Sequence, residues 1–571
     1  MKKPGFGQRK FNAILIASSL ELTVGSLLSL ADSAIVGHIV GENGLTAMNG
    51  IMPLITASIF IGSAIAGGSA LVYARAAGDF RKEDAYNAAG LSMLLSAAAG
   101  LLLMLAGQIG IPRYMVHIGA SEQVRALTRE YMLFFSLCLL ISPLKDLFSS
   151  FVYTDGGEMF GAAASIADSV GNVIFSIPLG LRMGMRGIAF GTLISNLLSM
   201  LILALYFFGP RCSLRLRVSF SKETLLLILK SSINSDIFFL YLAVLGIICN
   251  RLVVSCFGEA YLPMMTVLYA AIEIGIILEG AGEAVRPMVS AYMGEHNVPA
   301  IHKLMRGACR TNLLLGLLLS GLFLVSAPWI PYLFDLDRNS TLCQACTNGL
   351  RIYALSCVPM SWLALYDSYW LYIGRQKLSF FSNALKYFLF PAFLSIVLSR
   401  LLGPMGLWLG FGLEPLLSLG ILLLIGRSIY RNKHFPFLLE DGPAVFDCSL
   451  EPELEAVEEV NQAVDLFLCE QGVDAITVNL TKLALEEILL LTKEKNPGKR
   501  IVAECCVRVE EEGVCLVLWD SGNPFDVTDT DSDVSSLRAY VVSCIMLNNE
   551  KKNHMLNVGF NRTQLYFPFK E

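Results

Sequence analysis

The chain has 571 residues, of which 54% are hydrophobic and only 16% are charged, and its mean hydropathy is +0.59. This composition excludes an ordinary soluble globular protein for most of the length. The net charge of −5 says little about partners, and we expect no nucleic-acid partner.

Apolar segments of about 20 residues, each long enough to cross a bilayer as a helix, follow one another as far as residue 430. In lipid the backbone must satisfy its own hydrogen bonds, so these segments should be α-helices. We therefore expect an all-α, multi-pass membrane protein embedded in the lipid bilayer by twelve transmembrane helices. Their expected starts lie near residues 12, 47, 86, 128, 158, 186, 223, 261, 308, 349, 379 and 404.

Lysine and arginine residues mark every second loop between these segments and precede the first one. The intervening loops hold far fewer basic residues. By the positive-inside rule this asymmetry places both termini in the cytoplasm, in agreement with an even number of helices. The basic loops include Arg81 and Lys82, residues 211–222, Lys303 and Arg306, Arg375 and Lys377, and residues 427–433.

The same glycine pattern occurs in both halves of the apolar part. Because the same glycine and acidic residues follow in the same order in both halves, the sequence predicts two pseudo-symmetric six-helix lobes, residues 10–215 and 216–432. Doubled bundles of this kind bind a solute at the interface and expose it alternately to each side of the membrane. The pattern comprises Gly41-Glu42, Gly78-Asp79, Gly184, Gly187 and Gly191, then Gly258-Glu259, Gly294-Glu295, Gly403, Gly406 and Gly410.

Ionisable side chains inside spanning helices are costly and are therefore candidates for function. Asp32 in the first helix is the strongest candidate for binding a proton or Na⁺. Glu21 lies three turns earlier on the same face, or else at a water-facing helix end. Asp168 and Asn172 are one turn apart on the fifth helix. They would share a polar cavity with Asp32, unless Asp168 only caps or pairs near the end of its helix.

The second half offers a further group of acids. Glu273 and Glu279 share the eighth helix with Arg286, and Glu279 and Arg286 are two turns apart, which favours mutual neutralisation. Asp367 has aromatic neighbours in sequence that would form a wall beside it, or simply pack. No residue cluster predicts a metal site, because the 14 cysteines are scattered and lack histidine partners.

The composition changes sharply after Tyr430. Residues 433–445 read as a linker, and residues 446–571 as a small, two-layer α/β domain on the cytoplasmic side. Its expected helices cover 453–471, 473–495 and 532–548. Its expected strands cover 501–509, 514–519, the region near 555, and 563–569.

Three segments of the apolar part resemble signatures of the multidrug and toxic compound extrusion (MATE) family. They are residues 30–41 (Leu-Ala-Asp-Ser-Ala-Ile-Val-Gly-His-Ile-Val-Gly), residues 155–195 with Asp155-Gly-Gly and Asn172, and residues 279–294. The resemblance implies an antiporter in a bacterial plasma membrane rather than an enzyme. It would export bulky, cationic or amphipathic organic compounds, including drugs, in exchange for Na⁺ or H⁺, with no other cofactor.

The resemblance also assigns residues. Asp32 matches the first-helix acid of the family, and Asn172 matches its fifth-helix asparagine. Ser176 stands where many members have an aspartate, so Asp168 would replace that acid, or the coupling differs. Two alternatives remain open: a flippase for lipid-linked sugars, and a membrane sensor that signals through its C-terminal domain.

The C-terminal domain resembles the ATP-binding domain of histidine kinases and anti-sigma-factor serine kinases, at residues 483–488, 520–526 and 559–565. Carried over, Glu487 would act as the base, Asp520 would bind the adenine amino group, and Gly522 would admit the adenine. Leu491 replaces a Mg²⁺ ligand, and residues 533–540 replace the glycine-rich lid. Phosphoryl transfer thereby loses its electrostatic support. We expect a degenerate regulatory module with doubtful ATP binding and a cytoplasmic regulatory protein as partner.

Overall fold

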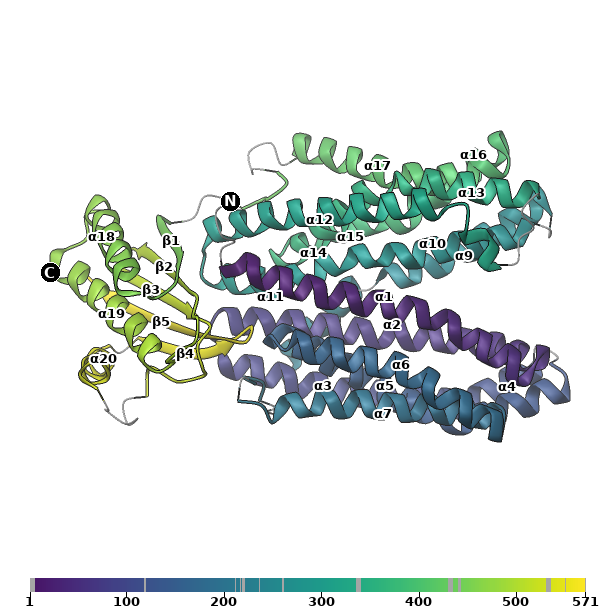
Figure 1. Ribbon diagram of the computed structural model, residues 1–571, viewed down its shortest axis with the longest axis horizontal. Coiled ribbons are helices and arrows are strands. Elements are labelled where there is room, and N and C mark those ends of the chain that lie inside the picture. The colour runs from purple at the N-terminus through teal and green to yellow at the C-terminus, as the bar shows by residue number, and fades with distance from the viewer. Residues whose placement is uncertain are drawn as a thin grey trace.

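The computed structural model describes residues 6–117, 120–210, 212–215, 217, 221–235, 237–258, 261–334, 340–429, 435–439, 443–529, 536–549 and 551–569. Within the helices, the side chains of residues 26–34 and of a few other residues lie outside this description. The molecule is a long bundle of helices with an α/β domain at one end (Figure 1). We call that domain the tail domain.

The first half of the bundle, here the first lobe, consists of seven α-helices. In the last two, Gly184 breaks the chain into a helical hairpin with a positive φ of 61°, which glycine adopts without steric cost. The helices are α1 (Phe6–Val40), α2 (Glu42–Gly78), α3 (Lys82–Leu105), α4 (Ile111–His117), α5 (Glu122–Asp155), α6 (Glu158–Met183) and α7 (Met185–Phe207).

The second half, here the second lobe, is more interrupted. A 3₁₀ turn (Ile276–Glu279) separates α10 from α11, and a π-helical turn (Leu385–Leu389) separates α15 from α16. The helices are α8 (Lys222–Ser235), α9 (Ile237–Phe257), α10 (Leu262–Gly275), α11 (Gly280–Gly294), α12 (Val298–Ser326), α13 (Thr341–Ala354), α14 (Cys357–Tyr372), α15 (Gln376–Ala384), α16 (Phe390–Leu402) and α17 (Pro404–Ile429).

Within the described residues, ten helices are long and apolar enough to cross a membrane. They support a multi-pass membrane protein. The other two expected segments correspond to α1, which is 35 residues long, and to α13 and α14, which are separated at Leu355–Ser356. The count of twelve stays a prediction.

The backbone repeats between the two lobes. Residues with positive φ occur in the same order in both halves, and each has a counterpart with a similar angle. Two of them, Phe80 and His296, are not glycines, and each is the third residue of the turn that begins at Gly78 or Gly294. The glycine pairs are Gly41 and Gly258, Gly156 and Gly374, and Gly184 and Gly403. This agreement supports two lobes of common design.

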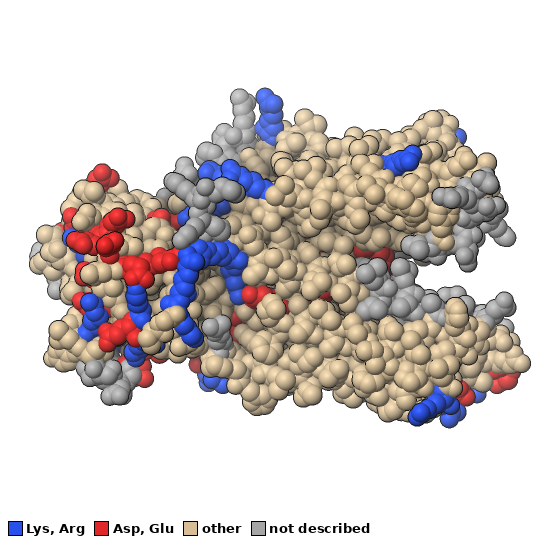
Figure 2. Space-filling model, viewed as in Figure 1, with Lys and Arg blue, Asp and Glu red and all other residues tan. Residues whose placement is uncertain are grey.

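The two lobes touch at the end that carries the tail domain. A methyl group added to Gly294 of α11 would lie 2.1 Å from the carbonyl oxygen of Gly78 in α2, so only glycine permits this crossing. Arg75 of α2 donates to the carbonyl of Leu371 in α14 at 2.9 Å. At the opposite end a gap separates the lobes (Figure 2).

The tail domain is a five-stranded antiparallel sheet in the order β1-β2-β3-β5-β4. Its three helices cover the sheet face that points away from the bundle (Figure 1). The sequence prediction did not include strand β1, which begins at the boundary between the expected linker and the expected domain. The elements are β1 (Val445–Leu450), α18 (Leu454–Glu470), α19 (Ala475–Glu494), β2 (Ala503–Glu510), β3 (Gly513–Asp520), α20 (Leu537–Leu547), β4 (Lys552–Asn557) and β5 (Phe560–Pro568).

Strand β3 is buried on both faces. Leu516 and Leu518 pack with the helices of the tail domain. Val517 and Trp519 alternate with them and belong to the same core as α1, α11, α12 and α14. Because neighbouring side chains of a strand point to opposite faces, the sheet joins the helical layer of the tail domain to the transmembrane bundle.

Candidate functional site

A cavity of about 240 Å³ lies between the lobes, lined by α1, α2 and α5 of the first lobe and by α11 of the second. Its charged residues are Glu21, Asp146, Glu283 and Arg286. Tyr153 donates a hydrogen bond to Glu21, and Arg286 pairs with Glu283 at 2.7 Å. We call this space the inter-lobe cavity. Glu21 therefore lies in a cavity shared by the lobes, not at a helix end.

A second cavity of about 310 Å³ lies inside the first lobe, lined by α1, α2, α5, α6 and α7. Lys145 of α5 forms an ion pair with Asp168 of α6 and donates to Asn196 Oδ1 at 2.9 Å. Both side chains of the ion pair are about one-fifth exposed. Asp168 thus faces a polar cavity along the helix rather than capping its end. We call this space the first-lobe cavity.

Asn172 and Ser176 form a hydrogen-bonded layer next to this ion pair. Asn172 lines the first-lobe cavity, and its Oδ1 accepts from Ser176 Oγ at 2.8 Å and from Thr192 Oγ1 at 3.0 Å. Ser176 is buried against Gly191, where an added methyl group would lie 2.6 Å from it. Ser176 therefore lies between α7 and Asn172, and its hydroxyl orients the Asn172 side chain.

The second lobe contains its own buried polar cluster around Lys386. The Lys386 ammonium lies 2.6 Å from Glu279 and 3.9 Å from Asp367, and Tyr387 also donates to Glu279. Lys386 and Asp367 are almost fully buried. A small cavity beside the cluster is lined by Lys386, Tyr387 and Glu414. The structure thereby brings together acids from three different helical segments.

The expected neutralisation of Glu279 by Arg286 is wrong. Arg286 pairs with Glu283, and Glu279 pairs with Lys386. Glu283 lies one turn before Arg286 on the same helix and therefore pairs with it in place of Glu279, which is two turns away. Glu273 lies in α10 and is not among the lining residues of the three cavities.

The two lobes carry related ion pairs with the charges exchanged. In the first lobe the lysine is on α5 and the acid on α6. In the second lobe the acid, Asp367, is on α14, and the lysine, Lys386, is on the π-helical turn that follows α15. Sequence reasoning missed Lys145. Its position inside an apolar segment, directly before Asp146, was the available signal. Asp32 lies in α1, but its side chain is outside the described residues.

The residues proposed for nucleotide binding form a closed internal network. Asp520 Oδ1 accepts from Asn561 Nδ2 at 2.9 Å and from the Gly522 N–H at 2.8 Å. Burial raises the pKa of Asp520 to about 6. A methyl group on Gly522 would lie 2.7 Å from Asn496. Arg538 pairs with Glu487 at 3.4 Å. Groups of the protein itself therefore bond to Asp520 Oδ1 and Glu487, and the nucleotide-binding assignment stays a prediction.

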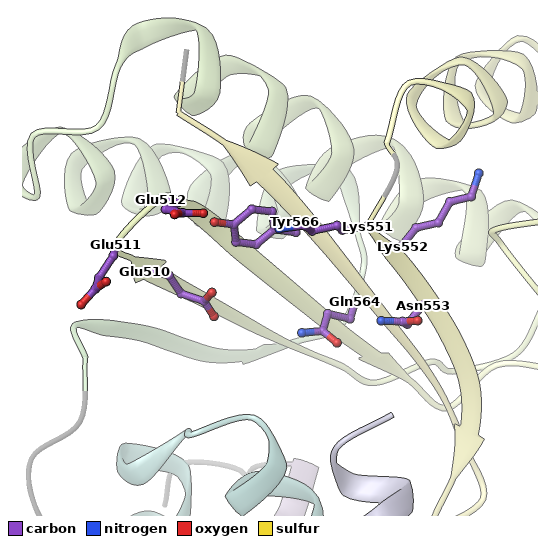
Figure 3. Close-up of a pocket in the computed structure, with 8 residues that line it drawn as sticks. All are labelled: Glu510, Glu511, Glu512, Lys551, Lys552, Asn553, Gln564 and Tyr566. Carbon is purple, nitrogen blue, oxygen red and sulfur yellow. The ribbon is translucent and has the colours of Figure 1, made fainter. Parts of the chain in front are cut away.

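A separate surface hollow of about 640 Å³ lies on the tail domain, between the β2–β3 turn and strands β4 and β5 (Figure 3). Lys551 lies over the ring of Tyr566 at 4.5 Å, next to the acidic turn residues Glu510, Glu511 and Glu512. None of the residues proposed for nucleotide binding lines it. It is an open, charged surface rather than a built site.

Comparison with known proteins identifies the architecture. Residues 17–177 match the family model described as MatE. The structure is similar to an outward-facing multidrug resistance MATE family transporter of the MOP superfamily, with a TM-score of 0.69, 21% identity, and coverage of 74% of this chain and 96% of that one. It is also similar to a MATE protein in its straight conformation, with a TM-score of 0.68, 21% identity, and coverage of 75% and 99%.

The chain has the MATE fold. A third similar structure is a MOP superfamily transporter from Pyrococcus furiosus whose binding pocket is described as having reverse polarity and suggesting a different function. Its TM-score is 0.67, its identity 20%, and the coverage 74% and 96%. Curated protein sequences give no match. The MatE match includes Asp32, Asp168, Asn172 and Ser176, so these four residues lie in the part of the MATE fold that sequence comparison also detects.

Proposed function

We propose that the chain is a MATE-type secondary transporter that exports organic compounds in exchange for Na⁺ or H⁺. The observation that carries this proposal is the inter-lobe cavity, which places carboxyl groups of both lobes around one space. The lobes meet at the tail end and are parted at the other (Figure 2). A bundle built from two like lobes can expose such a space to each side in turn.

The tail end would be the cytoplasmic end. Lysine and arginine side chains gather where the bundle meets the tail domain (Figure 2), as the positive-inside rule requires of a cytoplasmic surface. With this orientation, both termini are cytoplasmic and the state described here is closed inward and open outward.

The charges around the cavities favour cationic substrates. The inter-lobe and first-lobe cavities together are lined by four carboxyl groups and two basic groups. Both basic groups, Lys145 and Arg286, are already paired with an acid. The remaining carboxyl groups would attract a cationic or amphipathic organic compound. A flippase for lipid-linked sugars would need the opposite balance to hold a phosphate-bearing lipid.

Ion coupling would act through the paired acid of the first-lobe cavity. A proton or Na⁺ that binds Asp168 competes with the Lys145 ammonium for the same carboxylate. Binding would free the lysine to move within the cavity and so change the packing of α5 against α6. Asp32, in the neighbouring helix α1, remains the second candidate for this role.

The test is efflux from reconstituted vesicles under an imposed Na⁺ gradient and, separately, under an imposed H⁺ gradient. One of the two gradients should drive export of an organic cation. Asp168→Asn or Asp32→Asn should abolish the coupling while the protein stays folded. Asp84→Asn, a control at an exposed side chain, should not. Coupled efflux that is unchanged in both cavity variants would refute the assignment, and transport of a lipid-linked sugar instead of cations would favour the flippase.

A further inference from the structure

Arg562 of strand β5 reaches out of the tail domain and contacts both lobes at once. Its Nε donates to Glu295 Oε1 of the second lobe at 2.7 Å. Its two terminal nitrogens donate to the carbonyls of Ala77 at 3.2 Å and Gly78 at 2.9 Å, at the end of α2 in the first lobe. The guanidinium also lies 3.9 Å from the ring centre of Phe80. Both Arg562 and Glu295 are buried, with side chains 0% and 1% exposed.

Glu295 is surrounded by donors of the tail domain. Trp519 Nε1 donates to the same carboxylate oxygen at 2.7 Å, and Arg508 donates to the backbone carbonyl of Glu295. One turn earlier on α11, Tyr292 donates to Glu504 of β2 at 2.7 Å. The sheet thus binds the end of α11 through three strands, at the point where α11 crosses α2.

The tail domain also contacts the first lobe through the tip of its last hairpin. Gly156, between α5 and α6, packs against the backbone of Val558 and Gly559 so closely that a methyl group on it would lie 2.1 Å away. Phe6 at the start of α1 packs on Phe560, with ring centres 4.4 Å apart. The surface of the sheet is therefore shaped to both lobes in their present arrangement.

The two copies of the duplicated turn contact the tail domain differently. Asp79 and Glu295 occupy the same place in their two turns, after Gly78 and Gly294. Asp79 is 46% exposed and pairs only locally with Arg81, whereas Glu295 is enclosed by the tail domain. When the lobes part at this end, the carbonyl of Gly78 and the carboxylate of Glu295 separate, and one guanidinium can no longer bind both.

We propose that the tail domain is an intramolecular clamp that holds the two lobes together at the cytoplasmic end, with Arg562 as the residue that joins them. This inference rests on the alternation of the two lobes in the proposed function. It assigns the tail domain a role in the equilibrium between closed and separated lobes. The cytoplasmic gate, which is the contact of the lobes where α2 crosses α11, opens only when the sheet leaves the end of α11.

The test measures conformation rather than transport. Spin labels are introduced by Asp84→Cys and Lys377→Cys, at the starts of α3 and α15 in opposite lobes, after replacement of the reactive native cysteines. Their distance distribution is recorded by pulsed electron paramagnetic resonance in reconstituted full-length protein. Arg562→Ala should raise the ratio of molecules with separated lobes to molecules with closed lobes by at least about tenfold. The reason is that the closed form then buries the Glu295 carboxylate without its cationic partner.

Arg538→Ala is the matched control, since Arg538 is an ion-paired arginine of the same domain that lies in its helical layer. It should leave the distribution unchanged. Glu295→Gln keeps the size of the side chain and removes its charge. It provides a second test of the clamp if the Arg562→Ala protein does not fold or insert into the membrane. In the double variant Arg562→Ala with Glu295→Gln, the shift should not exceed the larger single effect. Equal distributions for Arg562→Ala and Arg538→Ala, or for Glu295→Gln and the parent, would overturn the clamp. Because this readout needs no substrate, it stands even if the transport assay fails.

Discussion

The crossing of α2 and α11 allows a direct test of the proposed cytoplasmic gate, the contact between the lobes at the tail end, that does not involve the tail domain. Gly294→Ala would place a methyl carbon 2.1 Å from the carbonyl oxygen of Gly78 and 2.2 Å from its carbonyl carbon. These are backbone atoms, so no side-chain rotation relieves the clash. The two helices must move apart, which is the movement that opening of the proposed gate requires.

The size of the effect follows from the cost of overpacking. An extra methyl group in a well-packed contact costs about 1–3 kcal/mol, which corresponds to about a 5- to 150-fold change in the ratio of open to closed molecules. The same label pair on α3 and α15 reports this ratio. Gly294→Ala should shift the distribution toward separated lobes without a loss of helical content.

The control is Gly321→Ala. Gly321 lies inside α12 and has open space around an added methyl group, so its replacement should leave the lobes closed and stabilise the helix slightly, by up to about 1 kcal/mol. If Gly294→Ala gives the same distances as Gly321→Ala, the lobes do not pack at Gly78 and Gly294 in the membrane, and the reasoning fails.

Three further predictions concern charge. Burial raises the pKa of Glu504 well above its usual value, so the docked sheet holds a proton that a released sheet gives up. The free energy that holds the sheet on the lobes should therefore fall by about 1.4 kcal/mol per pH unit above about pH 4.3, the pKa of an exposed glutamate. The fall should end once the pH exceeds the raised pKa of the docked Glu504. Label distances recorded between pH 5 and 8 should lengthen, and less so in Glu504→Gln; pH-independent distances would contradict this. The groups that face Glu504 are Tyr292, Glu295, Lys303 and Asp447. Lys145→Met should lower the free energy of unfolding in detergent by about 3 kcal/mol, and adding Asp168→Asn should recover most of it; simple additivity would show that the two groups do not interact. The full chain should show no saturable binding of a fluorescent ATP analogue below about 1 mM, because Asn561 and the Gly522 N–H already donate to Asp520 Oδ1, and a micromolar dissociation constant would disprove this.

Much of the architecture was predictable because it depends on local patterns. Apolar length predicted the spanning helices. The glycines at 41, 184, 258 and 403 predicted the repeat, and all four have positive φ, a backbone shape for which glycine is selected. The sequences of β2, β3 and α19 likewise predicted two strands and a helix, because apolar periodicity is a local pattern.

The partners of the charged groups were not predictable. Helical spacing suggested that Glu279 faces Arg286, but Glu283 is one turn closer and pairs with Arg286, and Glu279 meets Lys386 from a distant part of the chain. The pair Lys145–Asp168 joins two helices whose relative rotation no local pattern records. Arg562 and Glu295 are separated by most of the second lobe and the linker, so only the docked structure shows that they meet.

The clamp contact also differs in kind between its two sides. On the first lobe the hydrogen bonds of Arg562 go to the main-chain oxygens of Ala77 and Gly78, which every amino acid possesses, and the guanidinium also lies over the Phe80 ring. On the second lobe it binds a side chain that one substitution removes. Sequence drift in the first lobe would thus leave these hydrogen bonds intact as long as the residue at 78 remains small, and a change of Phe80 would remove the ring contact alone. If the proposed clamp operates, a change at position 295 alone would release the lobes from the tail domain, giving such proteins a one-step route between restrained and unrestrained forms.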